Sequence, residues 1–178
     1  YRRQRQMCIR DRFNTVRMEA VKLLSRYNDA NFVEAVRLGV NDPYELVSRL
    51  CADYAGNIGD PALLPDMVTA YLDCQERSRA AYTLSNSLAL FPKEDVAAAV
   101  NDFYARNNRY KGEAENRNVI KQYDRQVKFA EEHIAQMTDT TLTDAKRTSA
   151  IRFVRNNPYH QHLDTFFDLS LIHISEPT

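Results

Sequence analysis

Glycine and cysteine are scarce in this chain: its 178 residues contain four glycines and three cysteines. The glycines lack the spacing of a phosphate-binding loop, and neither Gly-x-Ser-x-Gly nor His-Glu-x-x-His occurs. So few cysteines, widely separated, exclude a disulfide-stapled fold and a Cys-x-x-Cys site. No apolar run approaches the roughly 18 residues of a membrane span. We therefore expect no catalytic, cofactor-binding or metal-ligating residues and no membrane segment.

The two ends of the chain differ from the rest. Residues 7–12 (MCIRDR) and 169–178 (LSLIHISEPT) resemble translations of transposon-end and adapter DNA from sequencing libraries, in matching orientation on the two sides. We interpret 1–12 and 169–178 as non-native, adapter-derived tails and leave them out of the fold prediction. The remainder, 13–168, is then expected to be a fragment of a longer protein.

Charge is unevenly distributed over 13–168. Residues 13–105 contain 8 basic and 13 acidic side chains, whereas residues 106–168 contain 11 basic and 9 acidic ones. A nucleic-acid-binding domain normally carries a basic stripe. The acidic balance of the first part makes nucleic acid an unlikely partner.

An internal repeat with a period of 31 organises the first part. The segments VRMEAVKLL, VSRLCADYA and SRAAYTLSN begin at equal intervals along the chain, at Val16, Val47 and Ser78. The first two place apolar residues on one helical face, at i, i+4, i+7 and i+8, and the third keeps this face in part. Each segment is followed by a break and a second helix, expected near 31–40, 62–72 and 93–104. Repeats of this length are typical of stacked helical units.

The stretch GNIGDP, 56–61, predicts the bend between two paired helices. Gly56 and Gly59 are expected to end the first helix, because glycine accepts a left-handed cap. Asp60 is expected to cap the second helix, with Pro61 at its first position.

The segment NDPYELVSRLCADYAGNIGDPALLPDMV, 41–68, resembles the HEAT repeat, especially the bacterial kind first noted in phycobilin lyases. The family's Asp-Pro, Val and Gly-x-Ile-Gly-Asp-Pro positions are all present, while Ser48 stands where the family has Arg. The resemblance covers about 16–105 and implies an all-α, armadillo-like α-solenoid of three stacked antiparallel helix pairs. It also implies structural roles in a polar ladder between units for Arg17, Asp42, Asp73 and Arg79.

The repeat fails after Arg106. Residues 107–118 read as a polar loop, 118–137 as a long amphipathic helix, and 143–157 as another, beginning at Thr143 or Asp144. We interpret 106–168 as a degenerate fourth unit or a helical cap.

Candidate binding residues lie on or beside the second helices, which line the concave face in HEAT stacks. They are Glu34, Asp66, Glu94 and Asp95. An acidic groove of this kind suits a basic peptide, and a merely solvated helix face is the alternative.

Other side chains are assigned to structure. Cys51 is expected to be a buried free thiol. The histidines of His160-x-His162 are expected at the surface, since neighbouring positions on a helix point to different faces. Four tyrosines that recur along the repeats are expected to pack in the core or between units: Tyr54, Tyr71, Tyr82 and Tyr104.

The resemblance favours a non-catalytic scaffold that binds a protein or basic peptide, as one module of a larger bacterial protein. The alternative is a helical part of an enzyme: a phycobilin lyase, a DNA-alkylation-repair glycosylase, or an appendage of a peptidase. The glycosylase would need a basic concave face for phosphates, which the acidic balance of 13–105 does not favour.

Overall fold

A computed structural model describes residues 13–74, 78–107 and 113–157, together with 159, 162, 164 and 166. The expected tails at 1–12 and 169–178, and His160, lie outside these residues. The described residues are predominantly helical and contain no strand, so the all-α prediction is confirmed. The helices are α2 (Asn14–Leu24), α3 (Ala30–Val40), α4 (Glu45–Ile58), the short η1 (Pro61–Leu63), α5 (Leu64–Asp73), α6 (Arg79–Leu88), α7 (Lys93–Arg106), α8 (Glu113–Thr138) and α9 (Asp144–Asn156).

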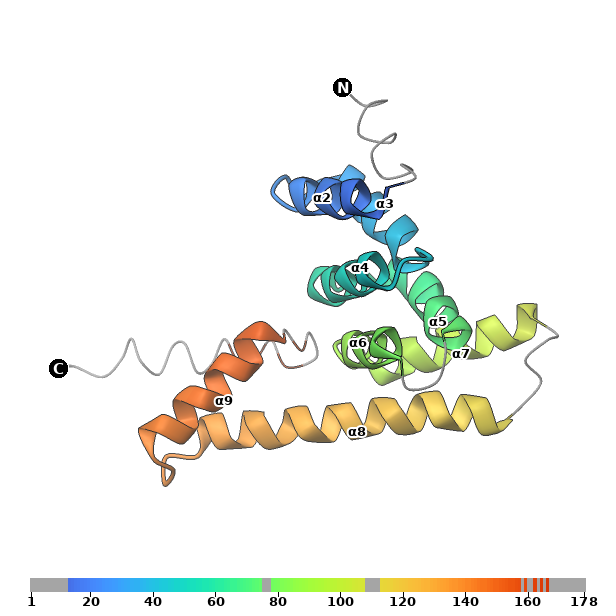
Figure 1. The fold of residues 1–178 in the computed structure, drawn as a ribbon. Coiled ribbons are helices and arrows are strands. Elements are labelled where there is room, and N and C mark those ends of the chain that lie inside the picture. The colour runs from blue at the N-terminus through green and yellow to red at the C-terminus, as the bar shows by residue number, and fades with distance from the viewer. Residues whose placement is uncertain are drawn as a thin grey trace.

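Helices α2 to α7 form two layers (Figure 1). In the first layer, α4 lies between α2 and α6 and contacts both. In the second layer, α5 lies between α3 and α7 and contacts both. Helix α4 also packs closely on α3 and α6. A single apolar cluster runs through both layers, from Val21 of α2 to Phe103 of α7, and continues into α8 at Tyr123.

The turns that join the layers follow from local sequence. Asp29 and Asp60 occupy equivalent positions in the repeat, and each caps a helix by accepting a backbone N–H from two positions further along the chain. Pro61 begins η1, where its missing N–H is not needed. Gly59 ends α4 in the left-handed conformation, with φ of 68°. The expectation for Gly56 is wrong, because it lies inside α4 and is buried.

Gly56 is required by packing rather than by a turn. A Cβ at this position would lie 2.8 Å from Leu90 Cδ1 and 3.1 Å from Ser87 Cβ, at the end of α6. Glycine therefore lets α4 and α6 approach each other within the first layer.

The expected apolar faces are correct in the middle unit and wrong at the edges. Val47 and Cys51 of α4 are 1% and 0% exposed. In contrast, Val16 and Leu23 of α2 are 37% and 54% exposed, because α2 is the end of its layer among the described helices. Tyr82 is 66% exposed, so its expected packing role is also wrong. Helix α6 instead buries Leu84 and Leu88.

Helix α8 crosses the end of the two layers and contacts both α6 and α7 (Figure 1). It begins at Glu113, so the polar loop expected over 107–118 is partly helix. Val119 and Tyr123 join the main core, and Tyr123 Oη donates a hydrogen bond of 2.6 Å to the carbonyl of Phe91, in the α6–α7 turn. This bond fixes the middle of α8 to the layers.

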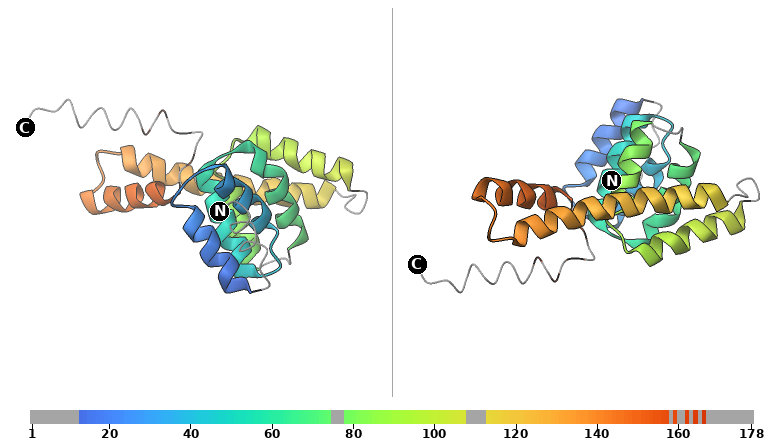
Figure 2. Two further views of the ribbon diagram at one scale, coloured as in Figure 1. Left: turned by 90° about the horizontal axis from the view of Figure 1, so that it is seen from above. Right: turned by 90° about the horizontal axis from the view of Figure 1, so that it is seen from below.

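Helix α9 folds back on the second half of α8, and the two project beyond the layers (Figure 2). Their contact is a separate small core of Ile134, Met137, Ala150 and Val154. Tyr159 packs with Leu90 and Ala130, which connects this region to the α6–α7 turn.

We expect Tyr123→Phe to cost about 1 to 2 kcal/mol of unfolding free energy at pH 8, the usual cost of losing a buried hydrogen bond. Burial, followed by the charges of Glu94, Asp124 and Asp95, raises the pKa of Tyr123 to about 12. A raised pKa stabilises the fold below the unfolded value near pH 10, and this contribution is lost as pH rises toward 12. The difference between wild type and variant should therefore shrink between pH 10 and 12. Urea unfolding at pH 8 and pH 11 measures it; an equal difference at both pH values contradicts the assignment.

Candidate interaction surface

The second layer is acidic, whereas the first layer is not. Helices α3, α5 and α7 carry six acidic and three basic side chains, while α2, α4 and α6 carry three acidic and four basic ones. The six acids of the second layer are Glu34, Asp66, Asp73, Glu94, Asp95 and Asp102. Among the side chains on helices α2 to α7, the acidic excess therefore lies in the second layer.

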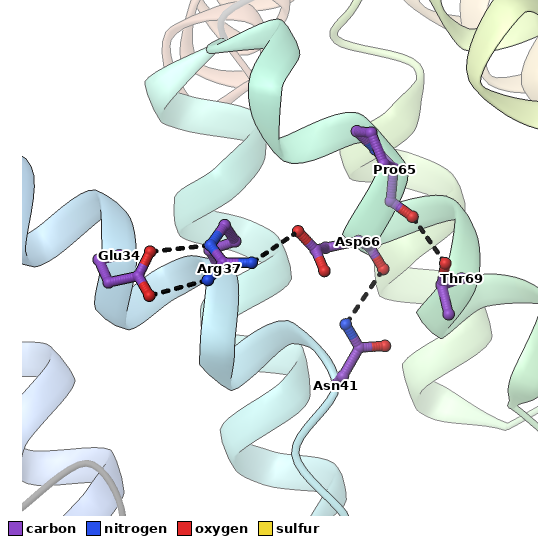
Figure 3. Close-up of polar contacts among 6 residues, drawn as sticks. All are labelled: Glu34, Arg37, Asn41, Pro65, Asp66 and Thr69. Atoms are coloured by element: carbon purple, nitrogen blue, oxygen red, sulfur yellow. Dashed lines mark hydrogen bonds and ion pairs between the residues drawn. The ribbon is translucent and has the colours of Figure 1, made fainter. Parts of the chain in front are cut away.

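Arg37 joins two of the predicted acidic residues (Figure 3). Its Nε and Nη2 donate to the two carboxylate oxygens of Glu34, both at 2.8 Å, and its Nη1 lies 3.6 Å from Asp66 Oδ2. Hydrogen bonding to Glu34 and the charge of that carboxylate raise the pKa of Arg37, so the guanidinium stays charged. Arg37 is not among the residues predicted from the sequence, and the charged groups of this cluster are two carboxylates and one guanidinium.

Asn41 and Thr69 accompany this cluster (Figure 3). Asn41 Nδ2 donates to the carbonyl of Asp66 at 3.4 Å, across from α3 to α5. Thr69 Oγ1 donates to the carbonyl of Pro65 at 2.7 Å. The contacts of Arg37 and Asn41 with Asp66 therefore connect α3 and its C-terminal end to the start of α5.

Glu94 and Asp95 lie elsewhere in the second layer, in the first turn of α7. Carboxylates are favoured there by the positive end of the helix dipole. Glu94 lines a hollow of about 480 Å³ between the start of α7 and the middle of α8, which Lys128, Glu131 and His162 also line. At its edge, Lys93 Nζ lies 2.7 Å from Asp124 Oδ1. The four predicted residues therefore form two groups rather than one.

Arg17 and Asp42 of the predicted structural ladder form an ion pair. Arg17 Nε and Nη2 each lie 2.7 Å from an oxygen of the Asp42 carboxylate, and Asp42 Oδ1 also accepts the backbone N–H of Tyr44 at 2.8 Å. This pair connects α2 to the α3–α4 turn. Asp73 ends α5 and Arg79 begins α6. Ser48, at the position of the missing family Arg, donates to the Val40 carbonyl at 2.6 Å.

Neither thiol has the setting of a nucleophile. Burial raises the pKa of Cys51 to about 12, and burial also raises the pKa of Cys74. A thiol with a raised pKa is a poor source of thiolate. Within 13–74, 78–107 and the other described residues, no three His, Cys, Asp or Glu side chains gather as metal ligands would. The described helices also include none with the length and apolarity to cross a membrane.

A scan against protein-family models gave no match for this chain, and searches of curated proteins and of solved structures gave none either.

Proposed function

We propose that the chain is a HEAT-type helical-repeat module that binds a basic segment of a protein partner and has no catalytic activity of its own. The acidic second layer is the observation that carries this proposal. Its helices hold twice as many acidic as basic side chains, while the first layer is nearly balanced.

The repeat architecture is supported by features that recur from one sequence unit to the next. Asp29 caps α3, and Asp60, at the equivalent repeat position, caps η1, which leads into α5. Helices α2, α4 and α6 stack in the same order as their sequence repeats. Stacked units of this kind create extended surfaces that suit extended peptides. The bacterial origin rests on the sequence resemblance alone and belongs to the same proposal.

The binding surface comprises the carboxylates on the outer side of α3, α5 and α7. Asp66 is the clearest contact point, because its side chain is 31% exposed and Arg37 approaches it only at 3.6 Å. A partner's arginine can bind this carboxylate bidentately, through hydrogen bonds shorter than the 3.6 Å approach of Arg37 to Asp66. Glu34, by contrast, already holds Arg37 through two bonds.

A nucleic-acid partner fits this surface poorly, since phosphates would meet carboxylates of the same sign. The DNA-glycosylase alternative requires the opposite charge on the second layer. Binding to a basic peptide should instead weaken as salt is added. Attraction between exposed charges is screened beyond a distance of about 8 to 10 Å near physiological ionic strength, and this distance shortens as the salt concentration rises.

The test is the combined variant Glu34→Lys/Asp66→Lys/Asp95→Lys, titrated against a fluorescein-labelled nonapeptide of Lys and Arg by fluorescence anisotropy. We expect at least a tenfold loss of affinity: the lost contacts at the part-exposed Asp66 and Asp95 contribute about 0.2 to 1 kcal/mol each. In addition, Glu34→Lys leaves Arg37 without its carboxylate partner, so the three reversed charges repel a basic peptide. Circular dichroism should show unchanged helicity.

The matched control is Glu19→Lys/Glu45→Lys/Asp53→Lys, which makes the same change of net charge on α2 and α4 of the first layer. It should retain most of the affinity. Equal losses in both variants would show that net charge alone drives binding, and salt-sensitive retardation of duplex DNA in a gel would refute the proposal.

A further inference from the structure

An apolar stripe runs along α2 on the side that no described helix covers. Its members within the helix, Val16, Ala20 and Leu23, follow a spacing of four and three residues, which places them on one helical face. Phe13 at the N-cap and Tyr27 in the turn after the helix flank them. Phe13, Leu23 and Tyr27 are 54%, 54% and 58% exposed, and Val16 is 37% exposed. A contiguous exposed apolar face of this kind marks an interaction surface.

The same positions one repeat later are covered. Val16, Ala20 and Leu23 correspond, one repeat further along the chain, to Val47, Cys51 and Tyr54 of α4. Val47 and Cys51 are 1% and 0% exposed, and Tyr54 packs against the core.

The cover on α4 is supplied by α3, the second helix of the preceding unit. Phe32 of α3 contacts the Tyr54 ring edge-on, with centroids 5.2 Å apart. Gly39 of α3 faces Cys51 so closely that a Cβ on the glycine would lie 2.3 Å from Sγ. Thus α3 covers these α4 residues in two ways: the Phe32 ring packs on Tyr54 at one end, and the bare backbone of Gly39 packs on Cys51 in the middle.

We propose that the α2 stripe is the docking face for a further helix pair of the same repeat type, whose second helix lies on α2 as α3 lies on α4. The inference rests on the repeat architecture proposed above, but not on the acidic layer. The α2 stripe fits such a helix because Ala20 is smaller than Cys51, so a glycine-bearing helix like α3 meets no clash there. A second copy of the chain would offer its own α2 stripe, which lacks a glycine at its centre.

The test uses the full chain with a second copy of residues 13–43 inserted between Arg12 and Phe13. The inserted unit brings its own α3 helix to the original α2. We expect the melting temperature to rise by about 5 °C or more, since large apolar side chains leave water. Amides of the original α2 should also exchange more slowly with deuterium than in the parent chain.

The matched variant is Val16→Asp/Leu23→Asp at the original α2. In the parent chain these side chains are exposed, so the melting temperature should change little. In the extended chain the same two substitutions should cancel the rise. A rise that survives them, or an insertion that leaves melting and exchange unchanged, overturns the proposal.

Sedimentation of the parent chain adds an independent readout. We expect a species whose mass is the same in the parent chain and in its Val16→Asp/Leu23→Asp variant. A parent dimer that Val16→Asp/Leu23→Asp converts to monomer would show that a second copy occupies the stripe, and this overturns the proposal. Because none of these measurements involves the basic peptide, failure here and failure of the binding proposal are distinguishable.

Discussion

Cys51→Asp should unfold the two-layer stack. Cys51 is fully buried at the α3–α4 contact, and its Sγ fills the space that the absent side chain of Gly39 leaves open. A carboxylate there is larger than the thiol, and burial, followed by the negative charge of Asp42, already raises the pKa of the thiol. An unpaired buried charge costs about 3 to 5 kcal/mol, a large part of the stability of a domain. Thermal melting followed by circular dichroism measures this loss.

Cys74→Asp is the matched control, because Cys74 is only half-buried at the end of α5. It should lower the melting temperature far less. Thiol labelling provides a second check, in which Cys74 should react with a disulfide reagent well before Cys51. Equal melting of the two variants, or fast labelling of Cys51 in the folded protein, would show that the α4 face is assigned wrongly.

Breaking the Arg17–Asp42 pair should have the next largest effect. The two side chains are 12% and 9% exposed, and they meet through two bonds of 2.7 Å. Arg17→Leu leaves the Asp42 carboxylate poorly solvated without its cation, which should cost about 3 kcal/mol of unfolding free energy. Urea denaturation of the variant measures the loss.

A double-mutant cycle separates the pair from its surroundings. Arg17→Leu/Asp42→Asn should be more stable than Arg17→Leu alone, since the unpaired charge is then gone while an oxygen remains for the Tyr44 N–H. Lys22→Met, which breaks the exposed pair with Glu19, should cost less than about 1 kcal/mol. Additive single effects at Arg17 and Asp42 would contradict an energetic coupling between them.

The sequence predicted those parts of the fold that depend on local chemistry. The cap at Asp60, the proline at 61 and the left-handed Gly59 follow from neighbouring residues alone. The buried face of α4 followed from helical period, because α4 has helices on both sides in its layer. The same rule failed at Val16 and Leu23, where burial depends on a neighbour and not on spacing.

The candidate site was less predictable, since it depends on register between helices. Arg37 lies one turn after Glu34, and that spacing was a usable signal for their ion pair. Its approach to Asp66 needed the packing of α3 on α5, which no local pattern encodes. Gly56 was assigned to a turn because glycine commonly ends helices, whereas the close approach of Ser87 of α6 and Leu90 of the α6–α7 turn explains it.

Carboxyl footprinting tests the central claim most directly. The full chain is labelled with a carbodiimide and glycine ethyl ester, with and without the basic nonapeptide, and the modification of each carboxylate is read by mass spectrometry. We expect the peptide to protect Asp66 and Glu94 of the second layer in a salt-sensitive manner, while Glu45 of the first layer stays equally reactive with and without the peptide. Protection of Glu45 with Asp66 and Glu94 unchanged would contradict this expectation.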